Sequence, residues 1–376
     1  MLIEVYDIQF ENNEASIVLE AVCDSFSSLL WDVEYYECGM FEVYIAANDR
    51  NFKTFKIGKI IGRSDDKTHY GIIESVKLET NAENGDYLTV TGRFLMSLLS
   101  RRIIYPTLTF YPRQSYGSIL QTAVNRNCIN AFFDSRGKRT IPSLELGSIT
   151  GNCWNKMRIL QISYENLMEW IYKICELIGG TANIRLQETG VNSGKFKMFF
   201  ELSEGVDRSI LQEENPHIIF SDSYNNLLNF SYLSDCSAMK NTAYIFGSGE
   251  GNNRKRTVFF QGEEPKNLDR YEIYVDAKDI QQESQENGET VKVPDAEYLE
   301  LLQEKGAENL IPITETSEST IAADGRQYKY NKDYFVGDYV TVQHERFGLI
   351  QPKIQLIGMI ESFDQNGRGL TPTFKF

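Results

Sequence analysis

The chain has 376 residues, of which 41% are hydrophobic and 24% are charged, and its formal net charge is −15. This is the composition of an ordinary globular protein, long enough for two or three domains with a sizeable buried core. The acidic balance argues against a general binder of duplex DNA, because affinity for the phosphate backbone comes from Lys and Arg side chains that release counterions.

Residues 1–100 are expected to form a first β-barrel-like domain. Short segments rich in β-branched and aromatic residues alternate there with clusters of Asn, Asp and Gly. Three of these segments are 16–24, 41–47 and 71–80. The run 84–86, Asn-Gly-Asp, is typical of a hairpin turn. The apolar spacing in 91–104 then predicts a short helix with one apolar side, formed by Phe94, Leu95, Leu98 and Leu99.

Residues 101–215 are expected to form an α/β middle domain with helices near 115–129 and 163–179. The second helix has the clearer signals, since Ser163 is an N-cap candidate and Gly179 and Gly180 end the pattern. Its apolar stripe comprises Leu167, Trp170, Ile171, Ile174 and Ile178, and core packing explains it better than a ligand wall. A hairpin that turns between Gly190 and Gly194 should follow.

Residues 216–376 are expected to form a second β-barrel-like domain with a helical insertion near 276–325. The helix in this insertion should have Pro294 in its first turn and Gly306 as its C-terminal stop. Polar segments flank it on both sides, which suggests an excursion from a β domain. The predicted fold class is therefore α+β and β-dominated, with two related β-barrel-like domains flanking an α/β middle domain.

Two sequence echoes bear on whether the β domains are related. Residues 71–76 are GIIESV and residues 358–363 are GMIESF, and each is followed by a polar turn and another strand pattern. A second echo, GDYLTV at 85–90 against GDYVTV at 337–342, needs a different offset. Because one duplication cannot produce both echoes, at least one of them arises by chance or from residue patterns that are common in strands. We favour the first, since each copy lies near the C-terminal end of its β region.

The stretch 244–260, YIFGSGEGNNRKRTVFF, combines alternating glycines with a run of cations. A dinucleotide or phosphate loop would need a helix after the glycines or a GK[ST] sequence, and neither is present. The segment after the glycines has a strand pattern instead. We therefore predict a hairpin, with Arg254, Lys255 and Arg256 in salt bridges or a subunit contact.

The sequence nominates no catalytic, cofactor-binding or metal-ligating residue. It has no GxSxG elbow and no zinc spacing of His and Cys. Its six cysteines lie far apart, so buried free thiols are expected. The acidic pairs Asp65/Asp66, Glu213/Glu214 and Glu263/Glu264 are adjacent and suit solvated turns better than a shared substrate. No secretory signal is expected, and no apolar run approaches the length of a membrane span.

Several phrases, taken in order, resemble the minor tail proteins of siphophages of the hub type. The first is an "f-s-l-w" phrase leading to "G-x-F-E", carried here by Phe26, Ser27, Leu29, Trp31, Tyr35, Gly39, Phe41 and Glu42. A "G-x-I" strand, a strand ending in glycine and an "LL-x-R" helix follow, at Gly71, Ile73, Thr91, Gly92, Leu98, Leu99 and Arg101. Later phrases are carried by Glu297, Tyr298, Leu302, Gly306, Asp333, Tyr334, Gly337, Asp338, Val340 and Val342.

This resemblance implies a non-enzymatic virion protein at the tail tip, similar to the baseplate hub proteins of contractile tails. It implies a homotrimer that joins a sixfold tail tube or distal tail protein to a threefold spike, fiber or lysin protein. DNA would pass through without specific binding, along a wall whose acidic charge does not retain phosphates. Since the sequence ends at TPTFKF, directly after a strand pattern, any lysin or host-binding module is expected on another polypeptide.

Two other classes of function stay open on the sequence alone. One is a hydrolase of cell-wall polymer, whose carboxylates can be far apart in the sequence. The other is a tail-tip module that binds a glycan or receptor through exposed Tyr and Trp. A hub should associate with threefold symmetry, a hydrolase should turn over purified sacculi, and a binding module should take up sugar saturably. Similar hubs occur in contractile bacteriocins and injection systems.

Overall fold

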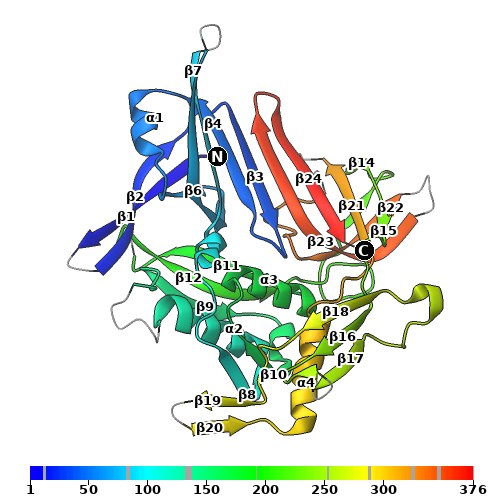
Figure 1. Cartoon of the computed structure of the whole chain (residues 1–376). Coiled ribbons are helices and arrows are strands. Elements are labelled where there is room, and N and C mark those ends of the chain that lie inside the picture. Colours follow the sequence, from blue (N-terminus) through cyan, green and yellow to red (C-terminus); the bar gives the residue numbers. More distant parts are fainter. Residues whose placement is uncertain are drawn as a thin grey trace.

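The chain folds into a β-dominated structure in which 24 strands and four α-helices are described (Figure 1). This computed structural model describes residues 1–11, 14–81, 85–131, 138–191, 193–251, 254–286, 289–322, 327–344 and 349–375. Within these ranges, no helix has both the length and the apolar character needed to cross a membrane.

The N-terminal strands form one continuous stretch of sheet in the order β3-β4-β7-β6-β5-β1-β2. Their bounds are β1 (Ile3–Glu11), β2 (Glu14–Cys23), β3 (Ser28–Glu34), β4 (Met40–Ala46), β5 (Ile60–Arg63), β6 (Asp66–Asn81) and β7 (Gly85–Phe94), with α1 (Asp49–Thr54) after β4. Buried and more exposed residues alternate along β3, so that Leu29, Trp31 and Val33 enter the core. The predicted Asn-Gly turn begins at Asn84, which lies outside the described residues.

The middle of the chain packs helices against strands around the largest hydrophobic cluster. Its elements are η1 (Leu95–Arg101), β8 (Leu108–Ser115), α2 (Tyr116–Val124), η2 (Asn125–Ile129), β9 (Leu144–Ile149), η3 (Cys153–Asn155), β10 (Met157–Ile162), α3 (Leu167–Ile178), β11 (Gly180–Glu188) and β12 (Lys195–Glu204). The helix expected over 91–104 is the shorter 3-10 helix η1, because Phe94 still belongs to β7. The N-cap of α3 is Asn166, whose side chain accepts from two backbone N–H groups, and not Ser163.

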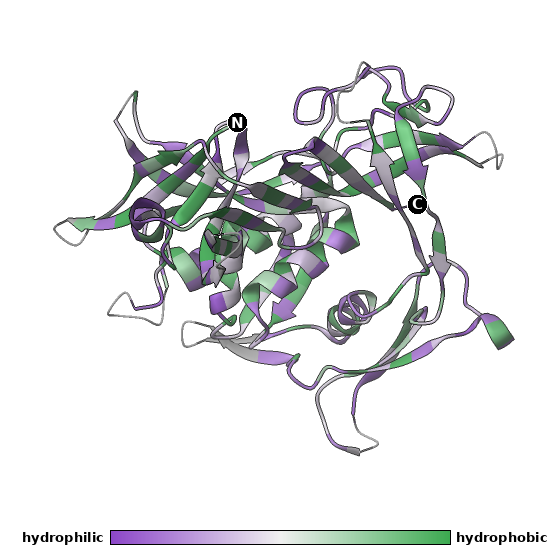
Figure 2. Cartoon of the chain, turned by 90° about the horizontal axis from the view of Figure 1, so that it is seen from above, coloured by the Kyte–Doolittle hydropathy of each residue, from purple (hydrophilic) through white to green (hydrophobic). Residues whose placement is uncertain are grey.

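The C-terminal strands lie beside the N-terminal ones in Figure 1, red next to blue. They are β13 (Ile219–Ser221), β14 (Leu227–Phe230), β15 (Leu233–Asp235), β21 (Thr314–Ile321), β22 (Tyr339–His344), β23 (Leu349–Asp364) and β24 (Gly367–Lys375). β23 pairs with β22 over its first half and with β3 over its second half. Figure 2 shows hydrophobic and hydrophilic residues alternating along these strands, as expected for a sheet with one buried face.

We call the β3–β23 pairing the seam. It runs antiparallel from the pair Glu34–Gly358 to the pair Leu29–Phe363, and it joins strands from both ends of the chain in one sheet. The strand pairings of the described residues do not close into a ring, so the prediction of β-barrel-like domains is correct only in that both regions are β-rich.

A smaller unit lies between β15 and β21. It comprises β16 (Thr242–Phe246), β17 (Arg256–Phe260), η5 (Asn267–Asp269), β18 (Glu272–Asp276), β19 (Glu283–Glu286), β20 (Glu289–Lys292) and α4 (Asp295–Ala307). α4 packs on β16 and β17 in a hydrophobic cluster of their own. Gly306 lies inside α4 and does not end it. A Cβ at Gly306 would lie 2.7 Å from the Ile245 side chain, so close packing explains the glycine.

The first sequence echo falls on equivalent hairpins. Residues 71–76 lie on β6, which pairs with the next strand β7, and residues 358–363 lie on β23, which pairs with the next strand β24. In the second echo, residues 85–90 lie on β7, the second strand of its hairpin. Residues 337–342 comprise a turn and the start of β22, the first strand of another hairpin. Its two copies therefore occupy different topological positions, which fits our preference for the first echo.

Two glycines of the N-terminal sheet make room for an aromatic ring. Phe41 on β4 is fully buried, and its ring lies against Gly92 on the adjacent strand β7 and against Gly71 on β6, the next strand beyond β7. A Cβ at Gly71 would lie 2.3 Å from this ring, and one at Gly92 would lie 1.9 Å from the backbone oxygen of Ile72. Residues from three separate phrases of the family resemblance therefore meet in one contact.

We expect Gly92→Ala to lower the free energy of unfolding by about 1–3 kcal/mol, because the added methyl group can be accommodated only if the backbone of β6 moves. Urea denaturation monitored by circular dichroism measures this loss. Thr89→Ala, at a half-exposed position of the same strand, is the control and should change stability far less. Equal losses for the two variants would contradict this account of the glycine.

Candidate functional site

The glycine-rich stretch forms a hairpin, as predicted. β16 and β17 pair antiparallel, and Gly249 and Gly251 have φ values of +111° and +51° in the segment between them. Arg254 donates to the carbonyls of Phe246 and Gly247 and pairs with Asp276, and Lys255 pairs with Asp295 at 2.9 Å. Arg254 and Lys255 thus form salt bridges, as predicted, and neither is free to hold a phosphate.

The described residues contain no group of three or more His, Cys, Asp or Glu that could hold a metal ion. All six cysteines are free thiols. Four are buried as expected, whereas Cys38 is half-buried and Cys236 is exposed. The adjacent acids Asp65 and Asp66 have different partners, because Asp65 pairs with Arg63 whereas Asp66 accepts from Trp31 and contacts His69.

The arrangement most relevant to function is a junction of three chain regions, which we call the three-way joint. It comprises Tyr35, Gly205, Gly337 and Asp338. The Tyr35 hydroxyl accepts from the Gly205 N–H at 2.9 Å and donates to the carbonyl of Gly179 at 3.3 Å. Gly337 has φ +103°, and a Cβ there would lie 2.1 Å from the Tyr35 ring. Only glycine fits this position, which explains the glycine of the Gly337-Asp338 phrase in the sequence.

Asp338 extends the three-way joint through its carboxylate. This nearly inaccessible side chain accepts from the backbone N–H groups of Val206 and Phe335 at 2.9 and 3.0 Å, and from Arg208 Nε at 2.8 Å. These donors come from the end of the middle region and from the segment before β22. One carboxylate therefore fixes the middle region against the C-terminal strands.

A buried ion pair reinforces the seam from within. Arg63 on β5 and Glu361 on β23 are both almost inaccessible, and Arg63 Nη1 lies 2.8 Å from Glu361 Oε1. Asp65 and Arg368 complete the network on its two sides. Burial alone would lower the pKa of Arg63, but hydrogen bonds and charges from Asp65 and Glu361 outweigh it and raise this pKa. The guanidinium is therefore fully charged inside the fold.

A second chain of polar contacts runs beside this ion pair. The Trp31 indole N–H donates to Asp66 at 3.1 Å, and the His69 ring nitrogen Nδ1 lies 2.9 Å from the same oxygen. The backbone N–H groups of Thr68 and His69 donate to the other oxygen. Burial opposes ionisation of Asp66, but His69 and these donors hold its pKa well below the ordinary value. The Trp31 of the family-like phrase is thus anchored to a buried carboxylate.

Glu34 at the end of the seam behaves in the opposite way. Burial, followed by repulsion from Asp32 and Glu37, raises the pKa of Glu34 to about 8. The side chain lies over Gly358, where a Cβ would come within 3.0 Å of both carboxylate oxygens. Near neutral pH this carboxyl is therefore largely protonated at the edge where the two ends of the chain meet.

The residues of α4 that carry the family resemblance lie mainly on one surface of the helix. Tyr298, Leu302 and Gly306 are spaced four residues apart, so they share a face of α4. The buried Tyr298 hydroxyl donates to the carbonyl of Ile280 at 2.8 Å and accepts from the N–H of Ser248 at 2.9 Å. This face thereby holds the glycine-rich hairpin in place.

None of these residues was nominated as a site residue from the sequence. Trp31, Tyr35, Gly337 and Asp338 were visible only as parts of family-like phrases. The first echo, GIIESV against GMIESF, contained one usable signal for these residues. Glu74 and Glu361 occupy the same position in its two copies, and each pairs with an arginine of the following strand. Arg63 and His69 gave no signal, and Asp66 was expected in a solvated turn but is buried, since no local pattern indicates that a polar side chain is buried by distant strands.

A family model and several solved structures match all or nearly all of the chain. The family model described as Siphovirus ReqiPepy6 Gp37-like protein matches residues 3–374. Among solved structures, a tail protein from Neisseria meningitidis MC58 matches with a TM-score of 0.57 and 12% identity, over 100% of this chain and 96% of its own. No curated protein sequence is a significant match.

Two further solved structures match at a TM-score of 0.53 and 11% identity, each over 100% of this chain. They are the prophage tail protein gp18 from Listeria monocytogenes EGD-e and the 43 kDa tail protein of prophage MuSo2 from Shewanella oneidensis. The matches cover 94% and 98% of those chains, respectively. At such low identity the likeness establishes a shared fold.

The two echo glutamates allow a matched test of the seam. We expect Glu361→Ala to cost about 3–5 kcal/mol of unfolding free energy, because it leaves Arg63 buried with only part of its counter-charge. Glu74→Ala breaks the partly exposed pair with Arg93 and should cost at most about 1 kcal/mol. Urea denaturation of both variants gives the comparison. Similar losses would show that the buried pair does not stabilise the seam.

Glu34 makes stability depend on pH. An unfolded glutamate loses its proton near pH 4.3, whereas Glu34 in the folded chain keeps it to about pH 8. The folded state therefore binds the extra proton between these values, and stability falls as pH rises through this window. Glu34→Gln cannot ionise, so it should raise the unfolding free energy by roughly 3–5 kcal/mol at pH 9 and by at most about 1 kcal/mol at pH 5.

Urea denaturation of the wild type and Glu34→Gln at both pH values tests this dependence. The control is Glu42→Gln, at an exposed position of β4, which should leave the difference between the two pH values unchanged. A gain of the same size at both pH values, or no gain at pH 9, would refute the role assigned to Glu34.

Proposed function

The chain belongs to the Siphovirus ReqiPepy6 Gp37-like protein family, and we propose that it is a structural virion protein, the homotrimeric hub at the tip of a phage tail. The observation that carries this proposal is the share of the chain that the matches cover. The family model spans residues 3–374, and the tail-protein fold spans the entire chain. This coverage supports a structural role that involves the whole fold.

The proposed symmetry follows from the two hairpins that carry the sequence echo. Each chain would contribute the β6–β7 region and the β23–β24 region to a ring, and three chains would contribute six such regions. A ring of this kind can match a sixfold tube on one side and a threefold spike or fiber on the other. The seam supports this role, because it fixes the relative orientation of the two regions within each chain.

The proposed partners are a tail tube or distal tail protein on one side and a spike, fiber or lysin protein on the other. The ring would form part of the DNA conduit. A net charge of −15 suits such a conduit, because carboxylates near the wall do not retain phosphates. At physiological salt the repulsion extends only about 8 Å, so it acts where DNA would otherwise adhere.

The solution mass of the purified chain tests the trimer. Light scattering over a concentration series should give a mass near three times 43.2 kDa, or a monomer mass that climbs toward it, because assembly depends on protomer concentration. A monomer mass at every concentration would count against the hub. Hydrolysis of purified sacculi, or saturable glycan binding by that monomer, would favour the hydrolase or the binding module instead.

A further inference from the structure

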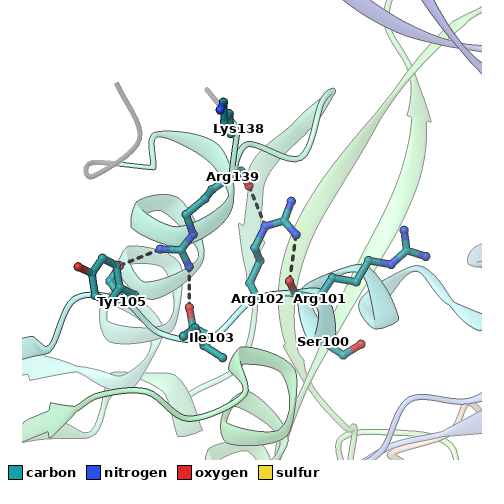
Figure 3. A pocket seen from close by; sticks show the side chains of 7 residues that line it. All are labelled: Ser100, Arg101, Arg102, Ile103, Tyr105, Lys138 and Arg139. Carbon is teal, nitrogen blue, oxygen red and sulfur yellow. Dashed lines mark hydrogen bonds between the residues drawn. The ribbon is translucent and has the colours of Figure 1, made fainter. Parts of the chain in front are cut away.

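A cluster of positive charge stands out on this acidic chain. It lines a cavity of about 510 Å³, which we call the basic cleft, formed by Ser100, Arg101, Arg102, Ile103, Tyr105, Lys138 and Arg139. Four of these seven residues are cationic, although the chain as a whole has a net charge of −15. In Figure 3, the side chains of Arg102 and Arg139 lie next to each other with their guanidinium groups pointing in different directions, Lys138 lies above them, and Arg101 extends to the right.

Backbone carbonyls hold Arg102 in place without neutralising its charge, and they also hold Arg139. Arg102 donates to the carbonyls of Arg139 and Arg101 at 2.8 and 3.0 Å (Figure 3). Arg139 donates to the carbonyls of Ile103 and Tyr105 at 2.7 and 3.1 Å. In the part of the chain that the structure describes, no carboxylate forms an ion pair with Arg101, Arg102 or Lys138. The positive charge is thus fixed in place and available.

A buried amide organises the cleft from behind. Asn127 is fully buried in the π-helical turn η2, and its carboxamide oxygen accepts from the backbone N–H of Tyr105 and from Arg139, at 3.0 and 3.1 Å. A π-turn is rare and tends to occur at functional positions. This side chain fixes the Tyr105 backbone and the Arg139 guanidinium together, so the cleft is preorganised.

Exposed apolar groups border the cleft. Ile103 and Tyr105 are 51% and 45% exposed, and the ring of Tyr164 lies 6.3 Å from that of Tyr105. Arginine and tyrosine beside an aliphatic side chain are typical of residues that anchor protein interfaces. The cleft therefore suits a carboxylate-bearing protein segment that also offers an apolar side chain.

The chain itself presents such a segment at another place. The acidic loop, residues 209–217, carries Glu213 and Glu214 at its exposed surface and Leu211 at 65% exposure. No ion pair among the described residues involves either glutamate. The loop leaves and returns next to β22, where the Ile218 N–H donates to the Arg208 carbonyl at 2.9 Å.

The acidic loop is held rigid by its own hydrogen bonds. The Gln212 side chain donates to the carbonyls of Ser209 and Asn215 and accepts from the Asn215 N–H at 2.7 Å. The His217 ring nitrogen Nε2 contacts the Gln212 carbonyl at 2.7 Å. A rigid loop loses little conformational entropy on binding, which favours association.

We infer that the basic cleft of one copy of the chain binds the acidic loop of a second copy, with Glu213 and Glu214 against Arg102 and Lys138 and Leu211 against Ile103. This inference deepens the proposed trimer and rests on it for its biological setting. The two surfaces differ, so the contact is heterologous, and a heterologous contact builds a ring when its rotation closes after a whole number of copies. A phosphate polymer fits less well, since the rest of the acidic surface repels it.

A charge-swap experiment on the full chain tests the contact. Arg102→Glu with Lys138→Glu should raise the apparent dissociation constant for self-association at least about tenfold, and so should Glu213→Lys with Glu214→Lys. In an equimolar mixture of these two double variants, a mixed three-membered ring has one native, one charge-reversed and one like-charged contact, so association should recover only in part. The quadruple variant, in contrast, restores opposite charges at every contact and should associate within about threefold of the wild type.

The matched control is Lys53→Glu with Lys56→Glu, which changes the net charge equally at exposed positions of the α1 region. It should leave association unchanged. Failure of the quadruple variant to recover, or an equal loss in the control, would overturn the contact. Retention of duplex DNA by the wild type, lost in the cleft variant without any change in association, would assign the cleft to phosphate instead.

A second measurement separates this inference from the trimer. Carbodiimide cross-linking of a mixture of ¹⁵N-labelled and unlabelled chains, read by mass spectrometry, should join Lys138 of one copy to Glu213 or Glu214 of another. A trimer without this cross-link, unaffected by charge reversal, would refute the contact and leave the hub standing. The cross-link at high concentration in a chain that never reaches trimer mass would support the contact and count against the trimer.

Discussion

The fold depends on the backbone pairing between β3 and β23, which holds strands from both ends of the chain in one sheet. Backbone pairing alone would leave this edge free to slip, because nothing in it specifies register. The buried Arg63–Glu361 pair and the anchored Trp31 supply that specification, since each satisfies its polar groups in only one alignment. The three-way joint then fixes the middle region against both ends.

The charges of the chain divide into two roles. Those at the seam are buried, paired and hydrogen-bonded, so they define one arrangement of strands at some cost in desolvation. In the basic cleft, Arg102 is held by backbone carbonyls, and in the acidic loop Glu213 and Glu214 form no ion pair with the described residues. Buried pairs thus establish the shape of one chain, whereas unpaired charges on rigid supports suit contacts between chains.

Much of the local structure could be predicted from the sequence. Apolar spacing located α3 and α4, and strand chemistry after the glycines showed that 244–260 is a hairpin. The failures came where distant segments decide the outcome. Gly306 looked like a helix stop, but Ile245 from another strand explains it. Arg63 and Glu361 lie 298 positions apart, and no local period marks such a pair. The barrel-like closure was an inference from the family, and strand pairing among the described residues does not complete it.

The seam also constrains when the chain can fold. β3 is made well before its partner β23. At about 5–20 residues per second, the 298 positions between Arg63 and Glu361 take roughly 15–60 s to synthesise. For that time one edge of the N-terminal sheet has no strand beside it and Arg63 lacks its main counter-charge. A chain cut short before β23 keeps both defects, so the N-terminal sheet reaches its final arrangement only once β23 has been made.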